Sequence, residues 1–399
     1  MSVPVSETSE KNPNPSHSRL SSKQNSSGGE GLVPVQTRNE RFASPVVTDF
    51  EQVTGREIQW KYTPLQKISA LIADAVDAAH DEYSVSSDSA SVETVGRDDP
   101  RIGRAGTPED RASASAWSNF AAATVVTLTG DTHSMTTLTR GNLGSVPRAS
   151  HTVVHATANS RGVVVFENTG DAQLTENVEI VVDDHAELTV VTVQEWTETS
   201  VHLASHFARL GRGAKLNYIS VTLGGALVRV NPTAQLSGEG ADVELSGLYF
   251  ADAGQYIEHQ VFVAHDAPRT KSRVAYKGAL QGEGAHTVWI GDVMITQNAP
   301  GTDSYELNRN LLLTDGARAD SVPNLEIETG DIQGAGHAST SGRFDDEQLF
   351  YLQSRGVPEA EARRLVVRGF LGEIVQRIGI PELESRLNES IEQELGASS

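Results

Sequence analysis

The chain has 399 residues, 38% hydrophobic and 21% charged, which is the composition of a soluble globular protein with one or two folded domains. Its 53 acidic residues outnumber 32 basic residues and give a formal net charge of −21, so we expect neither nucleic acid nor an anionic membrane surface as a partner. The absence of cysteine excludes disulfides, thiol nucleophiles and metal clusters held only by thiolates of this chain.

The N-terminal tail comes first. Residues 1–45 are rich in Ser, Asn, Pro and Gly and contain few large apolar side chains. Burial of so little apolar surface cannot offset the entropy of ordering the chain. We therefore predict that this tail is disordered.

Residues 46–118 are predicted to form an N-terminal helical segment and a linker. Thr63 can cap a helix, and Pro64 suits the first helical position. Apolar residues at helical spacing then predict a helix over 64–80. Residues 84–116 are polar and contain Gly and Pro, which indicates a long loop or linker.

Residues 119–344 are predicted to form the folded core. From 121 to 331 the chain consists of short β-rich runs separated by Gly, Asp, Asn and Pro. A turn phrase recurs around Ala186, Ala214, Ala241, Ala267, Ala285 and Ala317. The first three intervals are 28, 27 and 26 residues, and the later spacing is irregular. Such a period favours stacked layers, so we predict a mainly β protein with a parallel β-helix (β-solenoid) core, with a β-sandwich as the alternative.

Four histidines of this core need an interpretation. His202 and His206 would share one face of a strand, because side chains alternate along it. For this pair we favour a structural role over a metal site. His185 and His265 fall at predicted corners of the coil, where polar, turn-forming side chains are needed.

Residues 345–399 are predicted to form an α-helical C-terminal domain. A first helix ends at Gly356, a second begins at Pro358, and a third begins at Pro381. The third helix carries a narrow apolar stripe of residues spaced by four, namely Leu383, Leu387, Ile391 and Leu395. This stripe either packs on the first two helices or faces another protein.

Four stretches of the sequence resemble a known family. They are "WKYTPL" (Trp60–Leu65), "NRNLLLTDGARADSVPNLEIETGDI" (Asn308–Ile332), "GHASTSGRFDDEQLFYLQSRGV" (Gly336–Val357) and "EARRLVVRGFLGEIV" (Glu361–Val375). They resemble the SufB/SufD family of iron-sulfur cluster assembly proteins, over residues 50–378. SufB-type chains use cysteine in cluster assembly, so a chain without cysteine is most similar to the SufD branch.

The resemblance implies a β-helix core with helical segments at its ends, in agreement with the pattern of elements. It also implies a non-catalytic scaffold subunit in a complex with a SufB-like subunit and two copies of a SufC-like ATPase, supplied with sulfur by a cysteine desulfurase system. The chain has no GxxxxGK[ST] stretch, so we expect ATP to be bound by the partner and not by this chain. Free chains could also pair as homodimers.

The family's important histidine corresponds to His337 in this sequence, near the junction with the SufB-like subunit. The resemblance implies that His337 binds iron or a nascent, transient iron-sulfur cluster shared with that partner. Neutral imidazole is a competent iron ligand. Many SufD chains carry a cysteine two residues earlier, where this chain has Ala335. The alternative is a loop histidine with a purely structural role.

Contacts with the ATPase are expected from the helical C-terminal domain, 345–399. The residues expected to make them are Phe350, Tyr351, Arg355, Arg364 and Phe370.

Two other functions compete with this one. A carbohydrate-active β-helix enzyme would need carboxylates converging on one face of adjacent coils, and none lie at a common repeat offset. A β-helical structural protein without chemistry would give His337 no special role. The first 30 residues contain no apolar signal block, and no apolar run approaches the roughly 20 residues that span a bilayer, so we expect a cytoplasmic protein.

Overall fold

The structure is a computed structural model that describes residues 41–77, 83–343 and 346–397. Most of the predicted tail, residues 1–40, lies outside these ranges. The chain is already folded at Ser44, which is buried and whose amide donates to the carbonyl of Pro108 (2.9 Å). Ala43–Ser399 form one compact unit.

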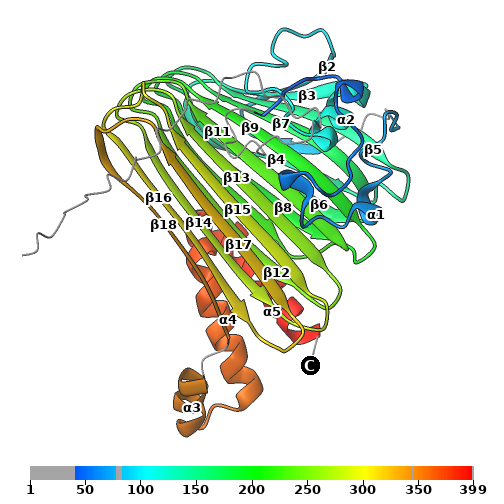
Figure 1. The fold of residues 1–399 in the computed structure, drawn as a ribbon, viewed down its shortest axis with the longest axis vertical. Coiled ribbons are helices and arrows are strands. Elements are labelled where there is room, and N and C mark those ends of the chain that lie inside the picture. The colour runs from blue at the N-terminus through cyan, green and yellow to red at the C-terminus, as the bar shows by residue number, and fades with distance from the viewer. Residues whose placement is uncertain (1–40, 78–82, 344–345, 398–399) are drawn as a thin grey trace, which may run out of the picture. The chain divides into compact units, whose positions relative to one another are not determined.

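Two nine-stranded sheets form the core of this unit (Figure 1). Sheet A has the order β17-β15-β13-β11-β9-β7-β5-β3-β2, and sheet B has the order β1-β4-β6-β8-β10-β12-β14-β16-β18. The strands of sheet A are β2 (Ser91–Gly96), β3 (Ala122–Leu128), β5 (Arg148–Ala156), β7 (Gln173–Val182), β9 (Val201–Leu210), β11 (Leu227–Leu236), β13 (Tyr256–His265), β15 (His286–Ile295) and β17 (Arg318–Ile327). Those of sheet B are β1 (Ser84–Ser87), β4 (Asp131–Gly141), β6 (Arg161–Gly170), β8 (Glu187–Trp196), β10 (Lys215–Thr222), β12 (Asp242–Ala251), β14 (Lys271–Leu280), β16 (Thr302–Leu312) and β18 (Ile332–Arg343).

From β3 onward, successive strands alternate between the two sheets, and each strand pairs in parallel with the strand one coil away. Leu216 of β10, for example, is paired with Leu188 of β8 on one side and Val243 of β12 on the other. These three side chains belong to the apolar cluster between the sheets, to which strands of both sheets contribute. The predicted parallel β-solenoid is therefore confirmed.

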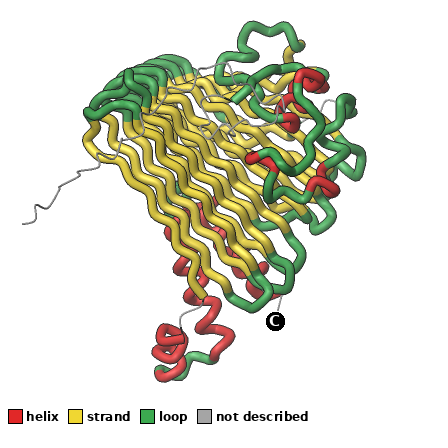
Figure 2. Tube along the Cα trace, in the orientation of Figure 1, coloured by secondary structure: helices red, strands yellow, loops and turns green. Residues whose placement is uncertain are grey.

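The irregular spacing of the turn phrases has a structural cause. Turns gather along the two edges of the solenoid (Figure 2). Ala186, Ala214 and Ala241 lie in turns that lead from sheet A to sheet B, whereas Ala285 and Ala317 lie in turns that lead from sheet B to sheet A. The first alanines therefore recur once per coil, and the last two belong to the opposite edge.

The predicted helix over 64–80 is wrong for most of its length. Only α1 (Leu65–Ile68) is helical, and residues 78–82 lie outside the described ranges. The hydroxyl of Thr63 donates to the Glu258 carboxylate (2.7 Å) and caps no helix. The apolar residues instead pack on the outer face of sheet A, in a cluster that includes Trp60, Ile68, Leu71, Ile72, Val201, Leu203 and Leu227.

The predicted loop over 84–116 is also corrected. It contains β1 and β2, which pair antiparallel with β4 and β3 and close the first end of the solenoid. It also contains the start of α2 (Arg111–Asn119), whose N-cap Asp110 accepts from the amide of Ser113 (2.8 Å). Small Ala and Ser side chains let α2 lie close to β5 and β7, so tertiary contact and not apolar periodicity forms this helix.

Three C-terminal helices occur as predicted: α3 (Asp346–Ser354), α4 (Glu359–Val375) and α5 (Pro381–Ala397). The apolar stripe of α5 packs with α4 on the outer face of sheet B, against residues such as Val191, Ile219 and Phe250. Lys277 of β14 anchors α4 by donating to the Phe370 carbonyl (3.0 Å). α3 projects away from the sheets (Figure 1). No helix within the described ranges is both long and apolar enough to cross a bilayer.

Candidate functional site

His337 lies in the middle of β18, so it occupies a strand and not the expected loop. Its side chain is exposed. Ala335, two residues earlier, packs against the apolar cluster between the sheets. Because side chains alternate along a strand, His337 lies on the same, inward side of sheet B. The imidazole is therefore placed at the mouth of the solenoid interior.

This mouth exists because the solenoid ends at β17 and β18. In the described chain, β17 pairs with β15 alone and β18 pairs with β16 alone. Residues of these two strands are half-buried or exposed, whereas every residue of β13 in the middle of sheet A is buried. Adjacent unpaired strand edges can add a strand from another chain.

Glu306 lies directly behind His337. The two residues are paired in the register of β16 and β18. Glu306 is only 1% exposed, and neither carboxylate oxygen has a hydrogen-bond partner among the described residues. Burial, reinforced by the charge of Asp292, raises the pKa of Glu306 to about 8. The carboxyl group lies beside Gly291, where an added Cβ would be 2.9 Å from Oε1.

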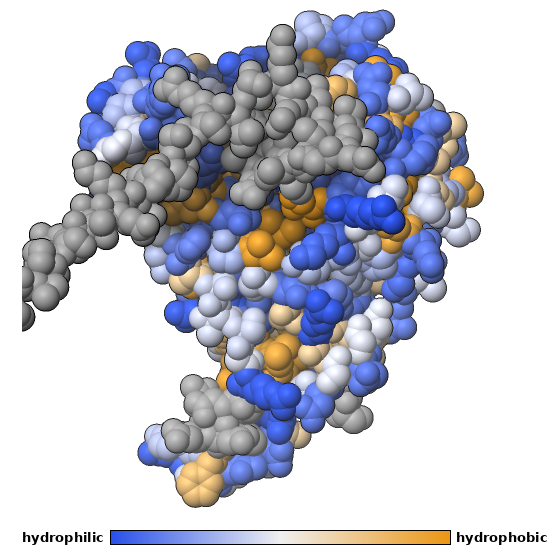
Figure 3. Space-filling view, in the orientation of Figure 1, coloured by the Kyte–Doolittle hydropathy of each residue, from blue (hydrophilic) through white to orange (hydrophobic). Residues whose placement is uncertain are grey.

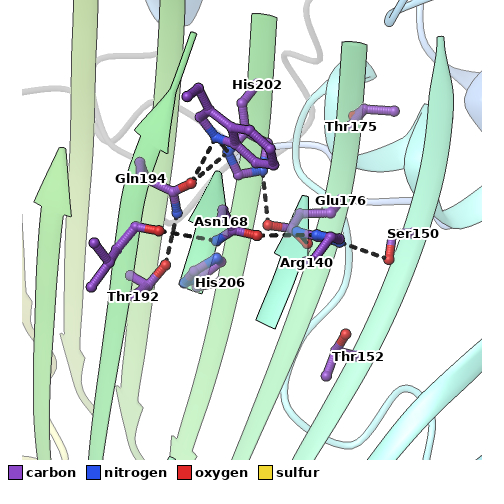
Figure 4. Close-up of polar contacts among 12 residues, drawn as sticks. Arg140, Ser150, Thr152, Asn168, Thr175, Glu176, Thr192, Gln194, His202 and His206 are labelled. Atoms are coloured by element: carbon purple, nitrogen blue, oxygen red, sulfur yellow. Dashed lines mark hydrogen bonds and ion pairs between the residues drawn. The ribbon is translucent and has the colours of Figure 1, made fainter. Parts of the chain in front are cut away.

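A contrasting polar network fills the interior near the first end (Figure 4). The guanidinium of Arg140 donates to Glu176 (2.8 Å) and to the Asn168 side chain (3.0 Å). Nε2 of His202 lies 2.8 Å from the other oxygen of Glu176. Burial alone would raise the pKa of Glu176, but Arg140 and His202 hold it well below its usual range. This buried charge is therefore fully paired.

The second histidine of the pair, His206, continues this polar side of the interior. Its Nδ1 lies 2.7 Å from the hydroxyl of Tyr218, and burial lowers its pKa to about 4. The predicted shared face of His202 and His206 is confirmed, because both point into the solenoid and contact neighbouring side chains. The described residues contain no group of three or more metal-binding side chains.

Polar side chains also line the solenoid interior toward its open end, the end formed by β17 and β18. His259 stacks on Tyr249 at 5.3 Å, and the hydroxyl of Tyr249 donates to Asn310 (2.7 Å). The amide of Asn310 in turn donates to Ser341 of β18 (3.3 Å). Sequence reasoning missed this network. Its signal was a run of polar residues at alternate, inward positions of otherwise apolar strands.

The two predicted corner histidines differ from each other. His185 is exposed in a turn with a positive φ of 59°, as a corner residue should be. His265 is instead the last residue of β13, fully buried and bonded to the hydroxyls of Thr270 (2.7 Å) and Ser272 (2.9 Å). His265 therefore lies directly before the predicted corner, at the end of the strand and not in the turn itself.

The five predicted docking residues fall into two groups. Phe350 and Tyr351 are exposed on α3, by 71% and 55%, and Arg355 stacks on the Tyr351 ring at 4.6 Å. Figure 3 shows a hydrophobic protrusion among hydrophilic residues at the end of the molecule where Figure 1 places α3. Arg364 and Phe370 are half-buried on α4, and Phe370 packs against the cluster over sheet B. The first group is thus presented outward, while the second contributes to the fold.

Comparison with known proteins assigns the family. Residues 139–370 match the family model described as the SufBD core domain of SUF system FeS cluster assembly. The chain belongs to the SufBD family. The matched segment begins in β4 and ends in α4, so it includes Glu306 and His337.

Individual SufBD family relatives support this assignment. An iron-sulfur cluster assembly SufBD family protein of Mycobacterium tuberculosis is 50% identical over 378 residues, covering 92% of this chain and 94% of its own length. One from Mycobacterium leprae is 48% identical, covering 92% of this chain and 96% of its own length. A second protein of this family from M. tuberculosis is 32% identical over 218 residues, covering 55% of this chain and 25% of its own length.

Proposed function

We propose that this chain is the SufD-type scaffold subunit of a complex with a SufB-like solenoid and a SufC-like ATPase that assembles iron-sulfur clusters. The observation that carries the proposal is the position of His337, the residue that the resemblance singles out, at the end of the solenoid that no described strand extends. A residue there can reach a ligand shared with a second chain. The absence of cysteine supports the SufD branch.

The SufB-like partner docks on the edges of β17 and β18. These edges carry backbone groups that no other described strand pairs with, and pairing with a partner strand satisfies them. His337 then faces the junction, where thiolates and carboxylates of the partner complete a transient cluster site. The same edges allow two copies of this chain to pair when the partner is absent.

The ATPase docks on α3, where exposed Phe350 and Tyr351 form an apolar surface with Arg355. Aromatic and Arg side chains are the usual anchors of protein interfaces. α4 follows α3 and is held on sheet B through Lys277 and Phe370. Closure of two ATPase subunits on ATP therefore pulls on the sheet that carries His337.

The chain itself is non-catalytic in this proposal and binds no ATP. ATP hydrolysis occurs in the SufC-like partner, and sulfur comes indirectly from a cysteine desulfurase system. The complex works in the cytoplasm on a transient cluster and is not bound to membrane or nucleic acid.

Co-purification tests this function. The untagged neighbours are expected to copurify with the tagged chain as one SufB-like subunit and two ATPase subunits. Replacement of Phe350 and Tyr351 by Ser should lower the ATPase from two copies to the one held by the SufB-like subunit, which stays bound. Ile58→Ser, at an apolar residue that is 50% exposed and far along the chain, is the control. Two ATPase copies retained by the complex of the doubly substituted chain would show that α3 is not the docking site.

A further inference from the structure

We propose that Glu306 is a second iron-binding residue of this chain, which supplies a carboxylate oxygen to a ferrous ion held by the His337 imidazole. The inference rests on the proposed role of His337 and deepens it. It makes this chain's contribution a histidine-carboxylate pair for iron entry, with the remaining ligands from water or the partner chain.

The register brings the two side chains together. Glu306 and His337 are partners on neighbouring parallel strands. Ser304 and Ala335, two residues earlier on each strand, are also partners. Neighbouring strands lie about 4.8 Å apart, and paired residues point to the same face. A first-row divalent ion forms bonds of about 2 Å to imidazole nitrogen and to carboxylate oxygen. One ion can therefore bridge the two side chains.

Glu306 is unusual among its neighbours on β16. Four polar residues of this strand point into the solenoid: Ser304, Glu306, Asn308 and Asn310. Ser304 bonds to a serine of β14 (2.7 Å), and Asn308 and Asn310 both bond to the hydroxyl of Tyr249 (2.9 and 2.7 Å). Glu306 alone of the four has neither oxygen paired with a described residue.

Such an arrangement is costly for the fold. A buried carboxyl group without a hydrogen bond loses its hydration and gains nothing in return. The chain nevertheless makes room for it, since any side chain at Gly291 would collide with Trp289 and Glu306. A position that burdens stability and lies behind the proposed iron ligand is best explained by a ligand that binds there.

The donor chemistry favours ferrous iron. Carboxylate oxygen is a hard donor and imidazole a borderline one, and a His-carboxylate set is typical of non-haem Fe(II) sites. The chain supplies no thiolate, because it has no cysteine. The pair therefore fits iron that arrives as an ion, while sulfur is held on the partner's side of the junction.

A titration of the full-length chain with Fe(II) under anaerobic conditions tests the inference. The readout is paramagnetic broadening of the His337 ring resonance in protein labelled at histidine, assigned with His337→Ala. Wild type should show selective broadening of His337, and Glu306→Gln should need at least about tenfold more iron for the same broadening. The matched control is Asp303→Asn, which removes a carboxylate from the outer face of the same strand and should leave the titration unchanged.

Failure of Glu306 as an iron ligand can be distinguished from failure of His337. If Glu306→Gln titrates like wild type, or Asp303→Asn is equally impaired, Glu306 is not an iron ligand, and the role of His337 stands. If iron broadens no His337 resonance even in wild type, the proposed role of His337 fails, and the inference fails with it.

Thermal unfolding excludes a trivial loss of structure. Glu306→Gln removes an unpaired buried acid without changing its shape, so its melting temperature should equal or exceed that of wild type. Weaker iron binding with unimpaired stability supports the inference. A lower melting temperature with unchanged iron binding would instead assign Glu306 a structural role and overturn it.

Discussion

The two ends of the solenoid interior each contain a buried glutamate, and the surroundings of the two carboxyl groups are opposite in character. Glu176, near the end closed by β1 and β2, is paired with Arg140 and His202. Glu306, at the open end, has no described partner. The pKa of Glu176 is held below its usual range, whereas that of Glu306 is raised to about 8. The paired charges of the closed end stabilise the fold, whereas the unpaired carboxyl group of the open end does not, which agrees with its proposed role as an iron ligand.

The largest effect on stability is expected for Glu176→Gln. The substitution removes the carboxylate charge that the buried Arg140 guanidinium contacts, and breaking a buried ion pair in this way costs on the order of 3–5 kcal/mol. Urea unfolding measures the change. The same substitution at the open end, Glu306→Gln, is the matched control and should cost nothing. Equal losses for the two variants would refute the contrast between the ends.

Stability should fall as the pH drops below neutrality. Burial lowers the pKa of His206 to about 4, of His259 to about 3 and of His265 to about 4, so these histidines are neutral when folded and take up protons on unfolding. Their contribution is complete above about pH 6.5 and is lost as the pH falls toward 4. Glu306 and Glu394 oppose them, because burial raises their pKa values to about 8 and about 7 and so stabilises the folded state as the pH falls from those values to 4.5.

Between about pH 6.5 and 4.5 the unfolded state thus binds about one more proton than the folded state, three from the histidines less one each from Glu306 and Glu394, and stability should fall by on the order of 1 kcal/mol per pH unit. Urea unfolding at several pH values measures the slope. His259→Gln should remove most of this slope, whereas the exposed corner variant His185→Gln should not change it. A slope that is the same in His259→Gln would show that His259 is not buried in the neutral form.

A smaller effect is expected for Gly291→Ala. The added Cβ would lie 2.3 Å from the ring of Trp289 and 2.9 Å from Glu306, so the open end must rearrange, at a cost of about 1–3 kcal/mol. Gly342→Ala on β18, where no atom lies within 4 Å of the new Cβ, is the control. Differential scanning calorimetry compares the two. Equal melting temperatures would mean that the space beside Glu306 is not tightly packed.

Local sequence patterns were sufficient for the core and the C-terminal helices. The strands of the central coils are bounded by turn residues at nearly constant spacing, and the stripe from Leu383 to Leu395 has the helical period. Both signals are local, because each element buries its own repeating face. The N-terminal segment does not follow its local pattern. Ile68 and Leu71 have helical spacing, but the helix ends at Ile68, and both side chains pack on the outer face of sheet A.

In the candidate site, too, one residue was proposed from local sequence and the other was not. His337 could be found from its motif, and Glu306 could not. In "DSYELNRN" the residues of β16 that face the interior are polar, whereas Tyr305, which faces outward, is large and 44% exposed. This is the opposite of the usual alternation, in which apolar residues face the core and polar residues face solvent. Only the register between β16 and β18 places Glu306 beside His337. Register between strands 31 residues apart depends on the whole coil and is not readable from either segment alone.

The smallest effect on stability belongs to His337→Ala, and this variant provides the sharpest test of the open end. The side chain is exposed on the last strand, so its removal should change the free energy of unfolding by no more than about 0.5 kcal/mol. Cluster formation by the reconstituted complex should nevertheless fall at least about tenfold, because the ion or cluster loses a ligand. His185→Ala, an exposed histidine on a turn in the middle of the solenoid, should leave both quantities unchanged. Cluster formation is followed by the visible absorbance of the bound cluster, and assembly of the complex by size-exclusion chromatography. If His337→Ala forms clusters at the wild-type rate, or loses activity only because the complex no longer assembles, the histidine supports the interface, and the open end holds no iron through it.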